Sequence, residues 1–168
     1  DVRKFATVSY VATKDIQDDI RFKYLGPEPL DKTFTAKIFF EQLVKRPNAP
    51  IKQVLLDQNI IAGIGNIYSD EMLWLADIHP LRKVKDITMT EMNKLYEGMK
   101  SALQKGIDFG GDSTSDYRDI TGERGKFQGK HEAYRRTGER CRKKGCKGTI
   151  IRIPFMGRGA HFCDTHQK

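Results

Sequence analysis

The sequence predicts a mainly α-helical protein that begins with one strand and ends in a small metal-held β-hairpin. Apolar residues recur at helical spacing in several segments between residues 35 and 105. A glycine turn at residues 59–66 separates two of these segments. Four residues that can ligate a metal lie in two close pairs near the end of the chain: Cys141, Cys146, Cys163 and His166.

Composition and charge restrict the class of protein. With 168 residues, 38% of them apolar, the chain can bury one good-sized core or two small ones. No apolar run approaches the ~20 residues that span a bilayer, so a membrane role has no support. Residues 120–168 carry 13 Lys and Arg against 4 Asp and Glu, whereas residues 1–119 carry 17 against 18. A positive excess confined to one small module favours a phosphate backbone as partner, and a solvated basic tail is the alternative.

The first residues predict a strand followed by a linker. Residues 1–13 are rich in β-branched and aromatic side chains, and an isolated strand is not stable alone. The chain also has no initiator methionine, so we expect Asp1 to be an interior point of a longer protein. Two prolines in Leu25-Gly-Pro-Glu-Pro-Leu30 exclude regular structure and predict a linker over residues 25–32.

Three helices and a longer fourth are expected between the linker and residue 109. The apolar spacing predicts helices over 35–45, 51–57 and 66–76, and Pro47 and Pro50 end the first. A capping box at Thr88-x-x-Glu91 predicts the start of an amphipathic helix that runs to about residue 105. The core should include Trp74, Met92, Leu95, Tyr96, Met99, Ala102 and Leu103.

The glycine turn is a candidate binding element. Gly63 and Gly65 allow the backbone to approach another group closely. Asn66 stands where the next helix presents unpaired N–H groups and the positive end of its dipole, which suits a phosphate. A glycine turn that merely joins two helices is the equally weighted alternative.

Residues 110–130 have little periodicity and predict a long surface loop, which in a compact protein is usually functional or disordered. Beyond it, residues 148–153 and 159–163 should form the hairpin strands, with the turn at residues 154–158. Arg158 would then be a cation at a rigid tip. Its place beside the metal ligands favours a phosphate contact over ordinary solvation.

The spacing of Cys141, Cys146, Cys163 and His166 predicts a structural zinc site. Zn²⁺ takes thiolate and imidazole in paired arrangements, and a hairpin that buries little apolar surface uses the metal as its core. Three unrelated thiols with a solvated histidine are one alternative. A disulfide between Cys141 and Cys146 is another, although it would leave one cysteine over.

Together these motifs resemble the formamidopyrimidine-DNA glycosylase and endonuclease VIII family of repair enzymes, along essentially the whole chain. Asp1-Val-Arg-Lys-Phe5 is similar to the family's Asp-x-Arg-x-Phe-Gly strand, and Leu25 to Leu30 matches its linker. Residues 56–71 resemble its helix-two-turn-helix signature, residues 110–127 its lesion-proximal loop, and Arg158 its zinc-finger arginine. Arg3, Phe5 and the form of the loop favour the formamidopyrimidine branch.

The resemblance implies five regions: 1–24, the end of an N-terminal β-sandwich domain; 25–32, the linker; 33–109, the helix-two-turn-helix domain; 110–130, the lesion-proximal loop; and 131–168, the zinc finger. It implies excision of oxidised purines, such as 8-oxoguanine and formamidopyrimidines, from double-stranded DNA, with nicking by β,δ-elimination at the abasic site.

The resemblance also assigns roles to residues. Arg3 would reach the orphaned base and Phe5 would wedge beside it, which helps to offset the cost of base flipping. Asn66, Lys52 and Arg158 would hold phosphates. Arg46 is a weaker phosphate candidate, chosen only because it opens the proline-bounded segment before Lys52. Arg158 would also take part in the second elimination. We expect one structural Zn²⁺ per chain, a monomer, and a place with the nucleoid in the bacterial cytoplasm.

Three departures from the family pattern are visible. The first cysteine pair encloses four residues instead of two, the last ligand is His166 instead of cysteine, and Ala6 replaces a glycine. The family's nucleophilic N-terminal proline, with its neighbouring glutamate and a lysine of that domain, cannot be placed, so we expect no glycosylase activity from these residues alone. A non-catalytic zinc-containing DNA-binding module and a zinc-ribbon protein-interaction domain are the competing classes.

Overall fold

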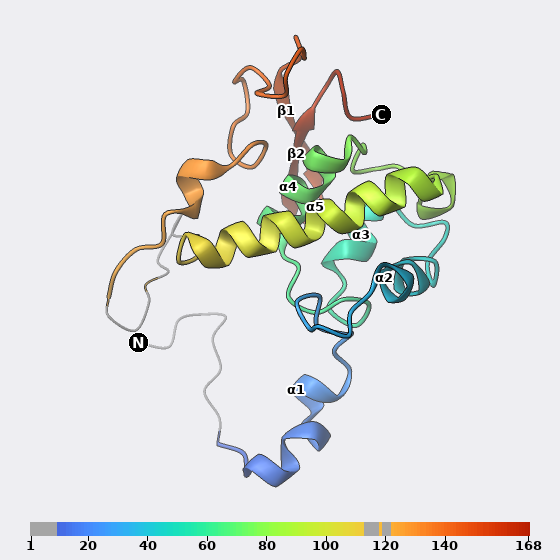
Figure 1. The fold of residues 1–168 in the computed structure, drawn as a ribbon, viewed down its shortest axis with the longest axis vertical. Coiled ribbons are helices and arrows are strands. Elements are labelled where there is room, and N and C mark those ends of the chain that lie inside the picture. Colours follow the sequence, from blue (N-terminus) through green and yellow to red (C-terminus); the bar gives the residue numbers. More distant parts are fainter. Residues whose placement is uncertain (1–9, 113–117, 119–121) are drawn as a thin grey trace.

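The computed structural model describes residues 10–112, 118 and 122–168, and its centre is a packed group of helices (Figure 1). The longest helix, α5 (Met89–Asp108), crosses the middle of the molecule and packs against α4 (Asn66–Ala76). The hairpin of β1 (Ile150–Phe155) and β2 (Arg158–Cys163) stands at one end, where β2 contacts α4. The described residues are therefore mainly helical with one two-stranded antiparallel sheet, and this part of the predicted fold is confirmed.

The N-terminal strand is not confirmed. Residues 1–9 lie outside the described part of the chain. Residues 10–12 have no regular structure, and the 3-10 helix η1 (Thr13–Asp18) and the short α1 (Ile20–Lys23) follow, so the prediction of a strand as far as Thr13 is wrong.

Residues 25–28, in the predicted linker, have no regular structure and lie along the turn that follows α3. Gly26 N donates to Gln58 O at 2.8 Å, and Ala62 N donates to Pro27 O at 3.2 Å. A side chain on Gly26 would meet the carbonyl of Ile60 at 2.4 Å, so this close backbone approach requires glycine.

The helices begin near the predicted residues, and threonine side chains cap two of them, α2 and α5. α2 spans Ala36–Leu43, and the Thr35 hydroxyl accepts from Ile38 N at 3.3 Å. α3 spans Ile51–Leu56, and η2 (Val84–Asp86) precedes α5. The capping box between Thr88 and Glu91 is formed, and α5 ends at Asp108, slightly beyond the predicted end.

The core lies between α2, α3, α4 and α5, and a smaller cluster lies under the hairpin. Buried residues of the first cluster include Phe39, Leu43, Met72 and Leu95. Tyr96 joins them, and its hydroxyl donates to Phe34 O at 2.9 Å. The core assignment of Trp74 is confirmed, although it belongs to the second cluster, with Ala133, Cys141, Ile150 and Cys163.

The hairpin turn is shorter than predicted. Phe155 pairs with Arg158, so the turn consists of Met156 and Gly157 alone. Both have positive φ, 47° and 73°, as a two-residue type I′ turn requires. Pro154 lies inside β1, which is possible because each strand of a two-stranded sheet has a free edge.

The predicted loop at residues 110–130 is only partly described and ends in η3 (Phe127–Lys130). Its two ends are joined: Lys126 N donates to Phe109 O at 2.8 Å, and Phe127 N donates to Gly111 O at 3.1 Å.

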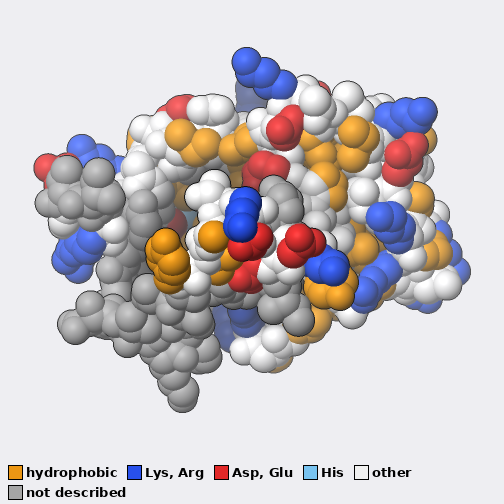
Figure 2. All heavy atoms as spheres, turned by 90° about the horizontal axis from the view of Figure 1, so that it is seen from below, with side chains coloured by type: hydrophobic (Ala, Val, Ile, Leu, Met, Phe, Trp, Pro, Cys, Tyr) orange, Lys and Arg blue, Asp and Glu red, His pale blue; other side chains and the backbone are white. Residues whose placement is uncertain are grey.

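Figure 2 shows the end of the molecule opposite the hairpin, where acidic and basic side chains of the described residues are interspersed. This mixed face agrees with the near balance of charge in residues 1–119. Within the described ranges, every helix is too short or too polar to cross a membrane.

Candidate functional site

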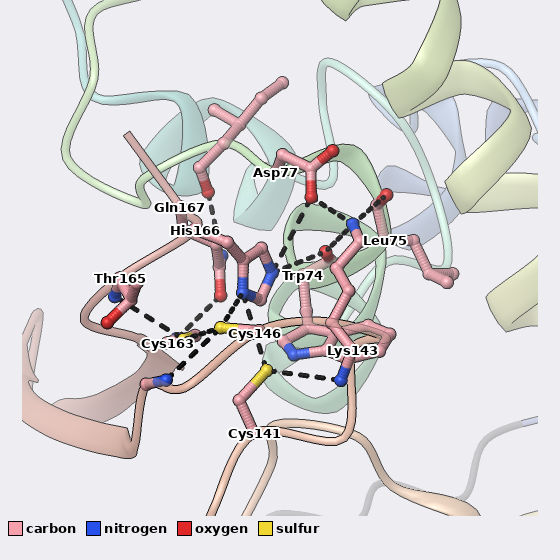
Figure 3. A network of polar contacts seen from close by, with 12 residues as sticks. Trp74, Leu75, Asp77, Cys141, Lys143, Cys146, Cys163, Thr165, His166 and Gln167 are labelled. Atoms are coloured by element: carbon pink, nitrogen blue, oxygen red, sulfur yellow. Dashed lines mark hydrogen bonds and ion pairs between the residues drawn. The ribbon is translucent and has the colours of Figure 1, made fainter.

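The four predicted metal ligands come together at the open end of the hairpin, away from its turn (Figure 3). Cys141 and Cys146 lie on the loop that precedes β1, Cys163 ends β2, and His166 follows in the next turn. Their ligand atoms all lie within 4.8 Å of one another, and the three thiols are free, with no disulfide. The disulfide and unrelated-thiol alternatives are therefore not supported.

The distances fit a tetrahedral metal. The Sγ atoms of Cys141 and Cys146 lie 3.5 and 3.6 Å from Nδ1 of His166, and the Sγ atoms of Cys146 and Cys163 lie 3.6 Å apart. A tetrahedral Zn²⁺ with ordinary bond lengths separates sulfur from nitrogen by about 3.6 Å and sulfur from sulfur by about 3.8 Å. These three distances are close to those of a tetrahedral site, so the cluster could hold a metal ion.

Surrounding groups orient the ligands. The backbone N–H groups of Lys143, Gly148 and Thr165 point at Sγ of Cys141, Cys146 and Cys163, at 3.4, 3.4 and 3.5 Å. Nε2 of His166 lies 3.3 Å from Trp74 O, which leaves Nδ1 for the metal. Without a cation, burial raises the pKa of Cys163 to about 11. A bound metal would reverse this and hold the thiolate.

Lys143 joins the metal loop to the end of α4. Its ammonium binds Asp77 and lies 3.5 and 3.3 Å from the carbonyls of Trp74 and Leu75 (Figure 3). A cation at the last carbonyls of a helix satisfies them and interacts favourably with the helix dipole. The four-residue spacer between Cys141 and Cys146 thus helps to hold the metal-binding loop against the end of α4.

A basic cavity of about 860 Å³ lies between the start of α4, residues 134–137 and the hairpin. Asn66 and Arg158, two of the predicted site residues, both line it. The rest of the lining is Ile67, Tyr134, Arg135, Thr137, Arg152, Gly159 and His161. Three arginines and the N–H groups at the start of an eleven-residue helix make the cavity suited to anions.

Asn66 links the glycine turn to the hairpin. Its Nδ2 donates to Gly159 O at 3.1 Å, next to Arg158, and Gly65 precedes it as the N-cap. Gly63 has φ 78°, a conformation that favours glycine, so the turn depends on this residue type. The structure therefore brings the two predicted binding elements to one place.

Lys52 has a different role from the one predicted. Its side chain is fully buried, and its ammonium lies 2.6 Å from Oδ1 of Asp70 and 2.7 Å from Oγ of Ser69. Burial lowers its pKa, and the charge of Asp70 acts against this shift. A side chain with no exposed surface cannot contact a phosphate, so the direct contact predicted for Lys52 is corrected to a role inside the protein.

Asp70 connects Lys52 to the hairpin. Its Oδ2 accepts from the backbone N–H of His161 at 3.1 Å and lies 2.9 Å from Nδ1 of the same residue. One buried carboxylate thus holds α3, α4 and β2 together below the cavity.

The next residue, Glu71, holds the segment at residues 132–134, which leads into the cavity wall at residues 134–137. Its carboxylate accepts from the backbone N–H groups of Glu132, Ala133 and Tyr134 at 2.8, 3.0 and 2.9 Å. Burial raises the pKa of Glu71, and these three donors act in the opposite direction.

The remaining predicted site residues lie elsewhere. Arg46 is paired with Asp57 at 2.8 Å and is not among the residues that line the cavity. Arg3 and Phe5 lie outside the described residues. Sequence reasoning missed Asp70, Glu71, Arg152 and Arg135. A signal existed for the acidic pair, because two adjacent carboxylates follow the glycine turn by one helical turn.

Comparison with known proteins agrees with this architecture. Residues 25–118 match the family model of the formamidopyrimidine-DNA glycosylase H2TH domain. The formamidopyrimidine-DNA glycosylase of Prochlorococcus marinus MIT 9301 is 43% identical over 100% of this chain and 57% of its own length. That of Lactococcus lactis IL1403 is 41% identical over 100% of this chain and 60% of its own length.

Solved structures are also similar. The MutM (Fpg) protein of Thermus thermophilus has a TM-score of 0.82 at 38% identity, covering 90% of this chain and 57% of that one. Lactococcus lactis Fpg in complex with abasic-site DNA has a TM-score of 0.83 at 38% identity, covering 94% and 57%. The chain spans less than two thirds of the length of these relatives. With its family model, its relatives and its fold in agreement, the chain belongs to the formamidopyrimidine-DNA glycosylase family.

Proposed function

We propose that this chain is the DNA-binding part of a base-excision repair glycosylase and AP lyase that removes oxidised purines. The observation that carries the proposal is the hydrogen bond from Asn66 to Gly159 O, which places the start of α4 and Arg158 on one basic cavity. Helix N–H groups and arginine are the groups that proteins use to hold phosphates. Related Fpg structures hold DNA with an abasic site or a damaged base, which supports the same partner here.

Within this proposal each site residue has its own role. The N–H groups at the start of α4 and the guanidinium of Arg158 would hold phosphates beside the flipped nucleotide, and Arg158 would assist the second elimination. Arg3 and Phe5 would act on the opposite strand. The nucleophile would come from outside these 168 residues. A Schiff-base trapping assay with borohydride on abasic DNA tests this, because a covalent adduct with this chain would contradict it.

The DNA site is tested by Asn66→Ala. Loss of the link to Gly159 should weaken binding to a duplex with a tetrahydrofuran abasic analogue by about 1–3 kcal/mol, without unfolding the protein. Asn93→Ala, on an exposed position of α5, is the matched control and should bind like the parent. Equal affinities for parent and Asn66→Ala would remove Asn66 from the site.

We propose Zn²⁺ as the metal. A donor set of three thiolates and one imidazole at tetrahedral distances is typical of structural zinc, and every position is taken by a protein ligand, so no catalytic position is open. Metal analysis should give one zinc per chain, and Cys146→Ser should melt the hairpin. Protein purified without chelator and containing no zinc would overturn the assignment.

The five regions, the monomeric state and a place with the bacterial nucleoid in the cytoplasm remain part of this proposal. Bacterial relatives support the location. The competing class, a zinc-ribbon protein-interaction domain, is separated by salt dependence, because phosphate binding loses affinity steeply as salt rises.

A further inference from the structure

Arg135 occupies an unusual backbone position at the edge of the cavity. Its φ is 58°, in the left-handed region that most side chains avoid. It is the third residue of a turn closed by Arg136 N, which donates to Ala133 O at 3.2 Å. A positive φ at this place in a turn usually selects glycine or asparagine. The fold therefore keeps a long cation where a small residue would be easier to accommodate.

The flanking contacts fix this conformation from both sides. Before Arg135, the backbone N–H groups of residues 132–134 are bound by Glu71. After it, the guanidinium of the buried Arg136 binds the carbonyls of Glu132 and Arg140 at 2.6 and 3.0 Å. Strained conformations persist where the surroundings determine them in this way, and they concentrate at functional sites.

The two neighbouring arginines have opposite environments. Arg136 is buried within the protein, whereas Arg135 is exposed and lines the cavity. The Arg135 guanidinium carbon lies 5.9 Å from the centroid of the Tyr134 ring, which limits the directions the side chain can take. Thr137, two residues on, adds a hydroxyl to the same wall.

The cavity has room for more than one phosphate. Its volume is about 860 Å³, and Arg158 stands on the hairpin wall while Arg135 stands on the wall formed by residues 134–137. A DNA strand carries one phosphate per about 3.4 Å of helix axis, so a strand held at the start of α4 presents further phosphates nearby.

We infer that Arg135 is the centre of a second phosphate subsite, separate from the one at Asn66 and Arg158, which binds a neighbouring phosphodiester of the same DNA. This inference rests on the proposed function. The strained turn would be retained because it places the Arg135 side chain at the cavity, and this gain would offset the conformational cost of a positive φ.

The test is a pair of variants that should keep the stability of the parent but lose affinity for DNA. Arg135→Gly and Arg135→Asn both tolerate the left-handed conformation and both remove the charge. Each should melt at a temperature no lower than the parent. Each should also lose about tenfold in affinity for the abasic-analogue duplex, and the slope of log affinity against log salt should become shallower by about 0.9, one phosphate contact.

Arg142→Ala is the matched control, because Arg142 is exposed and does not line the cavity. Its affinity and salt slope should stay close to those of the parent. Unchanged affinity and slope in both Arg135 variants, or an equal loss in Arg142→Ala, would overturn the subsite while leaving the proposed function in place. Failure of the parent to bind DNA would instead overturn the proposed function.

Discussion

Oδ2 of Asp70 accepts a hydrogen bond from the backbone N–H of His161 at 3.1 Å and lies 2.9 Å from the ring Nδ1 of the same residue. Because Oδ1 of Asp70 binds Lys52, a single carboxylate connects the helical turn to the hairpin. The relative position of the two DNA-binding elements thus depends on a buried charge that never meets solvent.

Asp70→Asn should therefore destabilise the protein strongly. It leaves the Lys52 ammonium buried without a countercharge, and breaking a buried pair in this way costs about 3–5 kcal/mol. Urea unfolding measures the loss. The double variant Lys52→Met, Asp70→Asn removes the unpaired charge and should recover a large part of it. A double variant no more stable than Asp70→Asn would show that the ion pair is not the cause.

Glu71→Gln should loosen the wall formed by residues 132–134. One carboxylate oxygen becomes an N–H₂ group, which cannot accept from a backbone N–H, and hydrogen bonds to a charged group contribute about 1.5–3 kcal/mol. We expect a loss of stability in that range and faster amide exchange at residues 132–134. Unchanged exchange there would contradict the anchoring role.

The N-terminal end of α5, which Thr88 caps, should give a pH-dependent contribution to stability. A hydrogen bond from Arg82 lowers the pKa of Glu91 from 4.5 to about 2, with further help from Thr88. The folded-state pKa is depressed, so the stabilisation is complete above pH 4.5 and is lost as the pH falls towards 2. Parent and Glu91→Gln should differ in free energy of unfolding at about pH 6, and the difference should shrink across this window. A constant difference would contradict the ion pair.

Gly159→Ala should weaken DNA binding with little loss of stability. An alanine Cβ would lie 2.3 Å from Nε of Arg152, so the arginine would have to leave its position across β2 at the edge of the cavity. We expect a several-fold loss of affinity, in the range of one phosphate contact. Gly129→Ala is the control, because a Cβ there meets no atom within 4 Å.

Much of this architecture follows from local sequence signals. Three features each depend on residues close in the chain: the capping box at Thr88, the start of α4 at Asn66, and the two close pairs of metal ligands. The structure places them within a residue or two of the predicted positions. Lys52 shows where such reasoning fails. Whether a lysine faces solvent or a buried Asp70, distant in sequence, depends on packing of α3 against α4, which local patterns do not contain. The hairpin turn was predicted too long, because the pairing of Pro154 with Gly159 and of Phe155 with Arg158 extends the strands up to a two-residue turn.

We propose that a metal held by Cys141, Cys146, Cys163 and His166 fixes the hairpin so that Arg158 and the start of α4 form one DNA site. The most direct test is affinity for the abasic-analogue duplex, measured as the metal is removed by a chelator and then restored. We expect an affinity loss of at least about tenfold in step with metal release, since phosphate contacts on the hairpin are lost together, and recovery when Zn²⁺ is returned. Unchanged affinity in protein verified to be metal-free would contradict it.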